Sequence, residues 1–328
     1  MMFSLLELAA ILLTLSALFG WLNNKFIPLP HTIGLLVMSV VVSLIMVGID
    51  VAVPDKHLFD ALTSALLQID FTSVVMNGML AFLLFAGALH LDLSKLRSRA
   101  VPVAILAFFG TVISTAVVGA GLYFFALLIG HPMPLPWALV FGALISPTDP
   151  VAVLSTLKNV KVPADLEIEM QGESLFNDGV GIVLFTILVR FAAGTGEDTS
   201  ALAISELLLI EAGGGVLLGL LTGYLAYQAM RLIDDYPVEV LITLALATGT
   251  YVLAQRLHVS GPLSVVAAGL LIGDRGPRYA MSERTQNYVF SLWTLIDEIL
   301  NSVLFLLIGL EVLVLRFEAK SLILAAAA

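Results

Sequence analysis

Residues 135–157 read LPWALVFGALISPTDPVAVLSTL, an apolar run of membrane-spanning length that two prolines interrupt near its centre. Pro147 and Pro150 each lack a backbone N–H, and each clashes with the carbonyl four residues back. The carbonyls of Ala143 and Ser146 therefore lose their helical partners. The run predicts a helix that is unwound in its middle.

The unwound segment holds Thr148 and Asp149 between the prolines. A charged residue at the centre of a membrane is costly, about 2.5–3.5 kcal/mol on insertion scales, so it points to function. Broken helices that present free oxygens are how transporters build cation sites. The alternative is a plain proline kink in which Asp149 caps the second half-helix.

Similar apolar runs recur along the chain. Its 328 residues are 59% hydrophobic and 12% charged, with a mean hydropathy of +1.04, whereas soluble domains carry about 25% charged residues. A membrane span needs helices or a closed barrel, and these runs lack the alternation of barrel strands. The sequence therefore predicts an all-α, polytopic transmembrane helical bundle, with helices at 4–22, 31–49, 73–92, 100–129, 135–157, 167–192, 203–233, 237–257, 261–273 and 284–315.

The predicted domain organisation is one transmembrane transporter domain over residues 1–328, with no soluble domain. An eleventh apolar run begins near Ser321 and stops at Ala328, too short to cross a bilayer. We therefore expect a chain truncated inside its eleventh helix. The absence of cysteine excludes disulfides, and no basic patch outside short loops suggests nucleic-acid binding.

The loops predict an orientation. Alternate loops divide the 15 basic residues into two sets, and the larger set faces the cytoplasm by the positive-inside rule. This arrangement places the N-terminus outside. The larger set comprises Lys25, Lys95, Arg97, Arg99, Lys158, Lys161, Arg231, Arg275, Arg278 and Arg284.

The helix predicted at 167–192 opens with a polar cluster. Ser174 and Asp178 share one face by their spacing of four, and Glu173 and Asn177 share the neighbouring face. The glycines at 172, 179 and 181 let another backbone approach. We expect this cluster to meet the unwound segment where the two helices cross.

Together the two segments supply hard oxygen ligands, which suit a small alkali cation. The predicted sodium site comprises Thr148, Asp149, Ser174 and Asp178. A polar packing network that binds no ion is the alternative.

Two signatures at this separation, ISPTDPVAV at 145–153 and GESLFNDGVGIVLF at 172–185, resemble those of bacterial monovalent cation:proton antiporters related to the eukaryotic sodium/proton exchangers. The resemblance covers essentially the whole chain, including FLLFAGALHLD at 82–92 and LNSVLFLLIGLE at 300–311. It implies the inverted-repeat antiporter fold, a homodimer and a cell (inner) membrane location.

The resemblance also implies roles for single residues. Asp178 is the ion- and proton-binding carboxylate, with Thr148, Asp149 and Ser174 as co-ligands. Glu173 departs from the family pattern, since no basic partner lies in any helix core of this chain. The family places that arginine on a helix past Ala328. The C-terminal helices, including a second broken one, are expected to be missing.

The expected function is sodium/proton antiport, with lithium or potassium as other cargo, no cofactor and no enzymatic chemistry. Desolvation lets Asp178 hold a proton, which a cation displaces, so the two compete. Asn177 cannot titrate, which favours electroneutral exchange by alternating access. The alternatives are a cation channel and an intramembrane aspartyl protease that uses Asp149 and Asp178.

Several other polar residues have plainer interpretations. The pair His90 and Asp92 is expected at the membrane interface. A glycine stripe at 215, 219 and 223 indicates packing inside the molecule. The three polar residues Asp297, Glu298 and Asn301 are expected to open the tenth helix at its cytoplasmic side, lining a funnel or solvating the helix end, with pH sensing as a further role.

Overall fold

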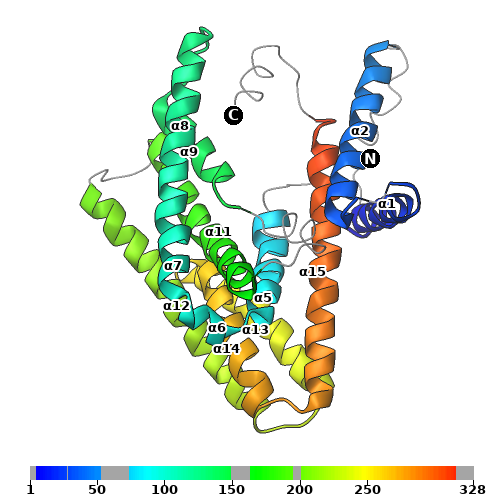
Figure 1. The fold of residues 1–328 in the computed structure, drawn as a ribbon, viewed down its shortest axis with the longest axis vertical. Coiled ribbons are helices and arrows are strands. Elements are labelled where there is room, and N and C mark those ends of the chain that lie inside the picture. Colours follow the sequence, from blue (N-terminus) through cyan, green and yellow to red (C-terminus); the bar gives the residue numbers. More distant parts are fainter. Residues whose placement is uncertain (1–4, 28, 53–73, 149–162, 195–200, 315–328) are drawn as a thin grey trace. The chain divides into compact units, whose positions relative to one another are not determined.

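The computed structural model describes residues 5–27, 29–52, 74–148, 163–194 and 201–314 (Figure 1). Every regular element within these ranges is a helix, which confirms the predicted all-α class. The elements are α1 (Leu5–Phe26), α2 (His31–Ala52), η1 (Val74–Met79), α5 (Leu80–His90), α6 (Leu93–Ser98), α7 (Ala100–Ile105), η2 (Leu106–Gly110), α8 (Thr111–Leu128), α9 (Leu135–Ile145), α11 (Ala164–Ala192), α12 (Ala201–Met230), α13 (Tyr236–Arg256), α14 (Gly261–Tyr279) and α15 (Glu283–Glu311).

Seven helices in the described ranges are long and apolar enough to cross a membrane. The chain is thus a multi-pass membrane protein, as predicted. The spans are Leu6–Phe26, His31–Asp50, Ala100–Leu128, Leu166–Ala192, Leu209–Met230, Tyr236–Arg256 and Glu283–Glu311, and two shorter apolar helices are Leu80–His90 and Leu135–Ile145.

The helix boundaries follow local chemistry. Gly130 and Gly194 adopt φ of 69° just past the ends of α8 and α11, the left-handed conformation in which helices commonly terminate. The predicted end of the helix at 261–273 is wrong, because α14 continues to Tyr279. An ion pair from Arg278 to Asp274, at 3.0 Å and a spacing of four, supports the extra turn.

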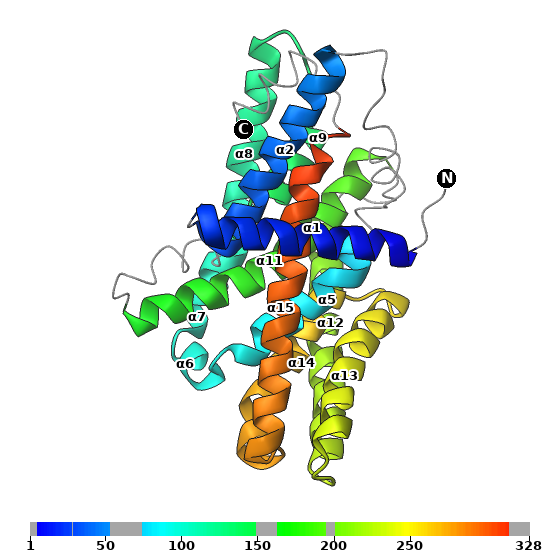
Figure 2. The same cartoon turned by 90° about the vertical axis from the view of Figure 1, so that its right-hand side faces the viewer.

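The chain divides into two compact units, and each is described by itself. The first contains α1, α2, η1, the start of α5 as far as Leu83, and the part of α15 from Leu295 onward. Figure 2 shows α1 crossing α2 at a steep angle. Its core is formed by Phe19, Leu35, Leu306 and Leu310, all buried. The hydroxyl of Ser43 donates to the Gly309 carbonyl at 2.9 Å and so joins α2 to α15.

The second unit runs from Leu84 to Thr294 and holds the predicted cation site. Its helices α12 and α14 pack side by side along a glycine stripe. A Cβ on Gly215 would lie 2.5 Å from the Ser260 carbonyl, and one on Gly219 would meet the Ser264 carbonyl. The prediction that this stripe packs inside the molecule is confirmed.

Candidate cation site

The apolar run that contains α9 breaks where the sequence predicts. The last residue of α9 is Ile145, and the Ser146 N–H makes a final bond of 3.1 Å to the Gly142 carbonyl. Pro147 follows directly and has no N–H to continue the ladder. The backbone therefore leaves the helix one residue before Thr148.

Helix α11 contacts this broken end through Ser174 and Glu173. The Ser174 hydroxyl donates to the Thr148 carbonyl at 2.6 Å. The Thr148 hydroxyl in turn donates to Oε2 of Glu173 at 3.1 Å. A carbonyl outside the helical hydrogen-bond pattern thus finds its partner on the neighbouring helix.

Asn177 ties the same groups together from one position. Its Nδ2 donates to Oε1 of Glu173 at 2.7 Å and to Oγ1 of Thr148 at 3.0 Å. Both hydrogens of the amide are therefore used. The side chain is 1% exposed, and its Oδ1 is buried with no hydrogen-bond partner among the described residues. That oxygen could take up a cation or a water molecule.

The predicted spacing of four between Glu173 and Asn177 is confirmed as a direct contact. The carboxylate oxygens of Glu173 accept from two neutral donors, the Asn177 amide and the Thr148 hydroxyl. Two hydrogen bonds offset part of the cost of taking a carboxylate out of water.

The predicted site residues divide into two groups. These hydrogen bonds bring together Thr148, Glu173, Ser174 and Asn177. Asp178 follows Asn177 directly on α11 and is half-buried. Asp149 and Pro150 lie outside the described residues, so their roles stay predictions.

Pro147 packs against α11 at Gly181. A Cβ at Gly181 would overlap the proline ring, so glycine is required for the broken segment to lie this close. The prediction that another backbone approaches the neighbouring glycines, Gly172 and Gly179, is wrong. What approaches Gly172 and Gly179 is the side chains of Leu96 and Leu263, not a second backbone.

The sequence reasoning missed a hydroxyl cluster at the end of α9. The buried Ser146 donates to the Gly142 carbonyl at 2.6 Å, and its Oγ lies 3.0 Å from that of Ser114 on α8. A Cβ on Gly142 would meet the Thr115 carbonyl, so α8 and α9 touch at their backbones. The adjacent Ser114 and Thr115 in an apolar run were the available signal.

A buried carboxylate on α13 was also missed. Glu239 is fully buried, and its Oε1 accepts from the Thr285 hydroxyl at 3.0 Å. Nearby, the Trp293 indole donates to Thr243 at 2.9 Å. The signal in the sequence was an acidic residue just inside the apolar run at 237–257.

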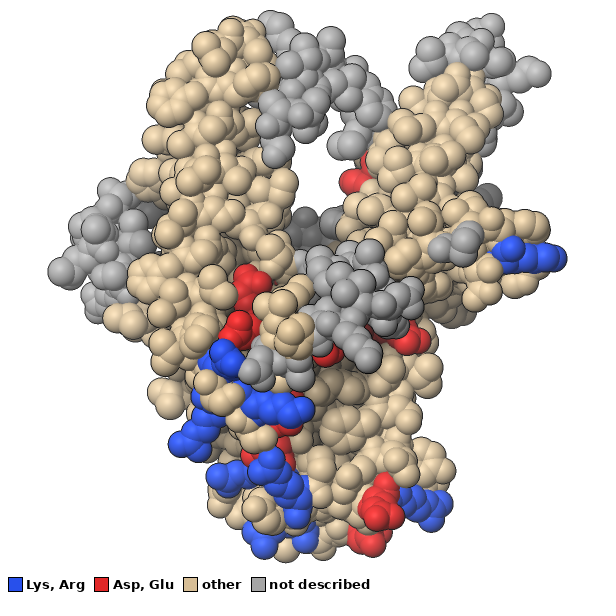
Figure 3. Space-filling view, viewed as in Figure 1, with Lys and Arg blue, Asp and Glu red and all other residues tan. Residues whose placement is uncertain are grey.

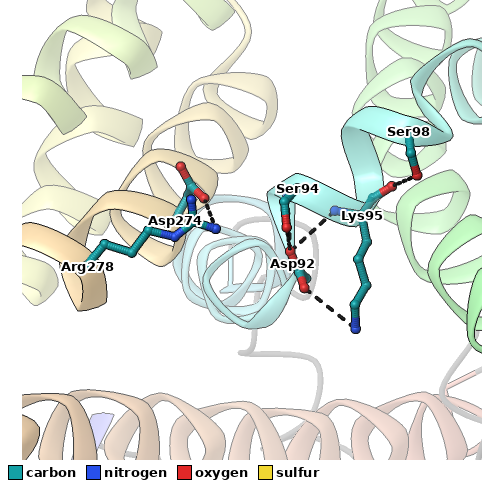
Figure 4. A network of polar contacts seen from close by, with 6 residues as sticks. All are labelled: Asp92, Ser94, Lys95, Ser98, Asp274 and Arg278. Carbon is teal, nitrogen blue, oxygen red and sulfur yellow. Dashed lines mark hydrogen bonds and ion pairs between the residues drawn. The ribbon is translucent and has the colours of Figure 1, made fainter.

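His90 and Asp92 have separate roles. The His90 ring bonds the Ala86 carbonyl at 2.7 Å and the Thr294 hydroxyl at 3.0 Å. Asp92 caps α6, accepting from the backbone N–H groups of Ser94 and Lys95 (Figure 4). The Ser94 hydroxyl, followed by these N–H groups and Lys95, lowers the pKa of the Asp92 carboxyl below its ordinary value.

The placement predicted for Asp297, Glu298 and Asn301 is wrong. Helix α15 begins at Glu283 and ends at Glu311, so the three lie near its middle and do not open it. The start predicted at residue 284 agrees with α15 to within one residue, so the error lies in treating these mid-helix residues as the beginning of the helix.

Comparison with known proteins identifies the family. The sodium/hydrogen exchanger transmembrane family matches residues 12–328. The Na(+)/H(+) antiporter NhaP of Pseudomonas aeruginosa is 46% identical over 315 residues, which cover 96% of this chain and 74% of that protein. The Na(+)/H(+) antiporter NhaH of Halobacillus aidingensis is 35% identical over 280 residues, which cover 83% of this chain and 67% of that protein.

A solved structure shares the fold. The sodium proton antiporter MjNhaP1 from Methanocaldococcus jannaschii superposes with a TM-score of 0.69 at 20% identity, covering 92% of this chain and 68% of that one. Because the family consists of transporters, the protease alternative is dropped. The chain belongs to the sodium/hydrogen exchanger family of transmembrane transporters.

Proposed function

We propose that this chain is a cation/proton antiporter that exchanges sodium, or another monovalent cation, for protons by alternating access at Asp178. The observation that carries the proposal is the hydrogen-bonded cluster where α11 meets the broken end of α9. The relatives named above carry the same activity in their names.

The proposed ligands are oxygens of Thr148, Asp149, Ser174 and Asp178. In support, the Thr148 carbonyl and the Ser174 hydroxyl oxygen are already 2.6 Å apart. The hydroxyl uses its hydrogen there and keeps lone pairs for a cation. Carbonyl, hydroxyl and carboxylate oxygens are the ligands that hard alkali ions prefer.

The cation and the proton compete for Asp178 in this proposal. Burial disfavours an ionised carboxylate, so Asp178 carries either a proton or a cation that restores its charge balance. If the site changes its exposure only when loaded, each cation that crosses is matched by a proton moving the other way. A ligand shifts such an equilibrium only through its different affinity for the two states.

Asn177 makes the exchange electroneutral, with one proton for each monovalent cation. Its amide does not titrate, and both of its hydrogens are engaged with Thr148 and Glu173. An acidic residue at that position would add a second group able to carry a proton. We further propose a homodimer in the cell (inner) membrane, with the N-terminus outside and one transmembrane domain.

Replacing Asp178 with Asn tests the assignment. The variant should lose both sodium movement and proton movement, measured as sodium-driven proton efflux from proteoliposomes. Thr186→Val, a change further along the same helix at a hydroxyl bonded to the Ile182 carbonyl, is the control and should keep exchange. Retention of substantial exchange by Asp178→Asn would remove Asp178 from the site.

The stoichiometry has its own test. A membrane potential set with valinomycin should leave the end point of wild-type exchange unchanged, because no net charge moves. An end point that follows the potential would require another titrating group. A cation current without proton movement would favour a channel instead.

A further inference from the structure

We propose that an anionic phospholipid binds in a crease between α6–η2, α11, α12 and α14, with its phosphate held by Arg97 and Arg275. The crease lies in the second unit, on the face of α11 that carries Phe176 and Val180.

Two adjacent cavities form the crease. One has a volume of about 510 Å³ and the other about 560 Å³. They share four lining residues, so they are continuous: Leu93, Arg97, Phe176 and Leu270. A third cavity of about 360 Å³ meets the first at Phe108 and Val180 and extends the crease along α11. Two neighbouring apolar channels suit the two acyl chains of a phospholipid.

The walls of the crease are almost entirely apolar. Alanine, valine, leucine and phenylalanine side chains line the first cavity, and Arg97 is its one charged residue. Part of the wall is η2, a π-helical segment at Leu106–Gly110 within the long helix that begins at Ala100. Such segments are frequent at functional sites, and here the segment presents Ala107 and Phe108 to the cavity.

At the charged end of the crease, two arginine side chains make no ion pair among the described residues. Lys95, Arg99 and Arg278 are each paired with a carboxylate, at 3.6, 3.1 and 3.0 Å. Arg97 and Arg275 make no ion pair among the described residues, and both are exposed. Arg97 lines both large cavities, and Arg275 lines the second.

The other polar groups of the second cavity are already satisfied. The Asp274 carboxylate is held by Arg278 (Figure 4), and the Tyr224 hydroxyl accepts from Gln228 at 2.8 Å. Figure 3 shows basic side chains gathered over the part of the second unit where α6 and α14 lie. The unmatched charge at the mouth is therefore positive, which selects an anionic headgroup.

The position of the crease along the spans favours a lipid over a soluble anion. Arg97 precedes Ala100, where a membrane span begins, by three residues. The guanidinium therefore lies at the level of the headgroups, while the apolar walls continue into the hydrocarbon layer. A free phosphate would use the two arginines and leave the apolar channels without an occupant.

The lipid would also contact the helix that carries the cation site. Phe176 lines both large cavities and is the neighbour of Asn177, whose side chain reaches the broken end of α9. Occupancy of the crease would therefore hold α11 in place, and any effect on transport rests on the proposed function. The binding itself does not depend on that function.

The test is a lipid titration of the full chain in detergent, followed by native mass spectrometry and thermal unfolding. Dioleoyl phosphatidylglycerol should bind and raise the unfolding temperature, whereas dioleoyl phosphatidylcholine and glycerol 3-phosphate should not. The double variant Arg97→Gln/Arg275→Gln should weaken phosphatidylglycerol binding about tenfold or more, the scale for removing two basic residues near a lipid anion.

Two further variants complete the design. Arg256→Gln removes an exposed cation from the end of α13, a helix that lines none of the three cavities, and should bind like wild type. Ala104→Trp fills the first cavity and should abolish binding with both arginines intact. Equal binding of phosphatidylcholine, binding of glycerol 3-phosphate alone, or a double variant equal to Arg256→Gln would overturn the proposal. Because each readout is binding, failure of the antiport proposal would leave these results unaffected.

Discussion

Replacing Asn177 with Leu probes how the broken end of α9 is held. Leucine has the same number of side-chain heavy atoms as asparagine and a similar branched shape, but it donates no hydrogen bond. The change removes the bond of 2.7 Å to Glu173 and the bond of 3.0 Å to Thr148. The Thr148 hydroxyl keeps its own bond to Glu173, so the cluster is loosened without being dismantled.

The magnitude follows from the groups involved. A hydrogen bond to a carboxylate contributes about 1.5–3 kcal/mol and one to a hydroxyl about 0.5–1.5 kcal/mol. Against this loss, the variant also removes Oδ1, which is buried without a partner among the described residues and so costs about 1–3 kcal/mol in the wild type. The net destabilisation should be about 1–2 kcal/mol, well below the sum of the two lost bonds.

The assay is the free energy of unfolding from a reversible SDS titration of the purified chain, together with vesicle exchange. Thr186→Val on the same helix is the control, because its hydroxyl bonds the carbonyl of Ile182 one turn back, a contact that adds little to helix stability. Asn177→Leu should also raise the KM for sodium, since Thr148 loses one of the three hydrogen bonds that hold it. Unfolding energies equal to those of Thr186→Val would refute the reasoning.

The two remaining predictions concern packing and pH. Gly219→Ala should lower the unfolding temperature, because its Cβ would meet the Ser264 carbonyl, whereas Gly213→Ala, with open space at its Cβ, should leave it equal or slightly higher; equal losses would contradict the packing argument. Asp92 has a pKa lowered from 3.8, first by the Ser94 hydroxyl, so its capping contribution is present above that value and lost as pH falls below it. Thermal unfolding between pH 6 and about 3 should show this loss in wild type and a smaller one in Asp92→Asn; identical pH profiles would exclude it.

The helices and the break were predictable because they depend on short-range chemistry. Apolar runs of span length require helices in lipid, and Pro147 ends α9 through its missing N–H. The contact of Glu173 with Asn177 was likewise predictable, since a spacing of four places two side chains on one helix face.

The contacts between helices could not be predicted from the sequence in the same way. The hydrogen bond from Ser174 to the Thr148 carbonyl depends on how α11 crosses α9. No local sequence pattern predicts that crossing. The hydroxyl that donates to the buried Glu239 belongs to Thr285, 46 residues away. The end of α14 was missed because Asp274 and Pro277 look like a boundary, whereas Arg278 reaches back and continues the helix.

The close packing of α12 against α14 has a mechanical consequence. At Gly215 and Gly219 the helices meet without a side chain between them, against the carbonyls of Ser260 and Ser264. Sliding one helix past the other would drive the next side chain into a carbonyl, so the pair resists shear. We therefore expect α12 and α14 to move together as a rigid body in any rearrangement that accompanies transport. Spin labels placed on the two helices should keep a constant separation throughout the transport cycle.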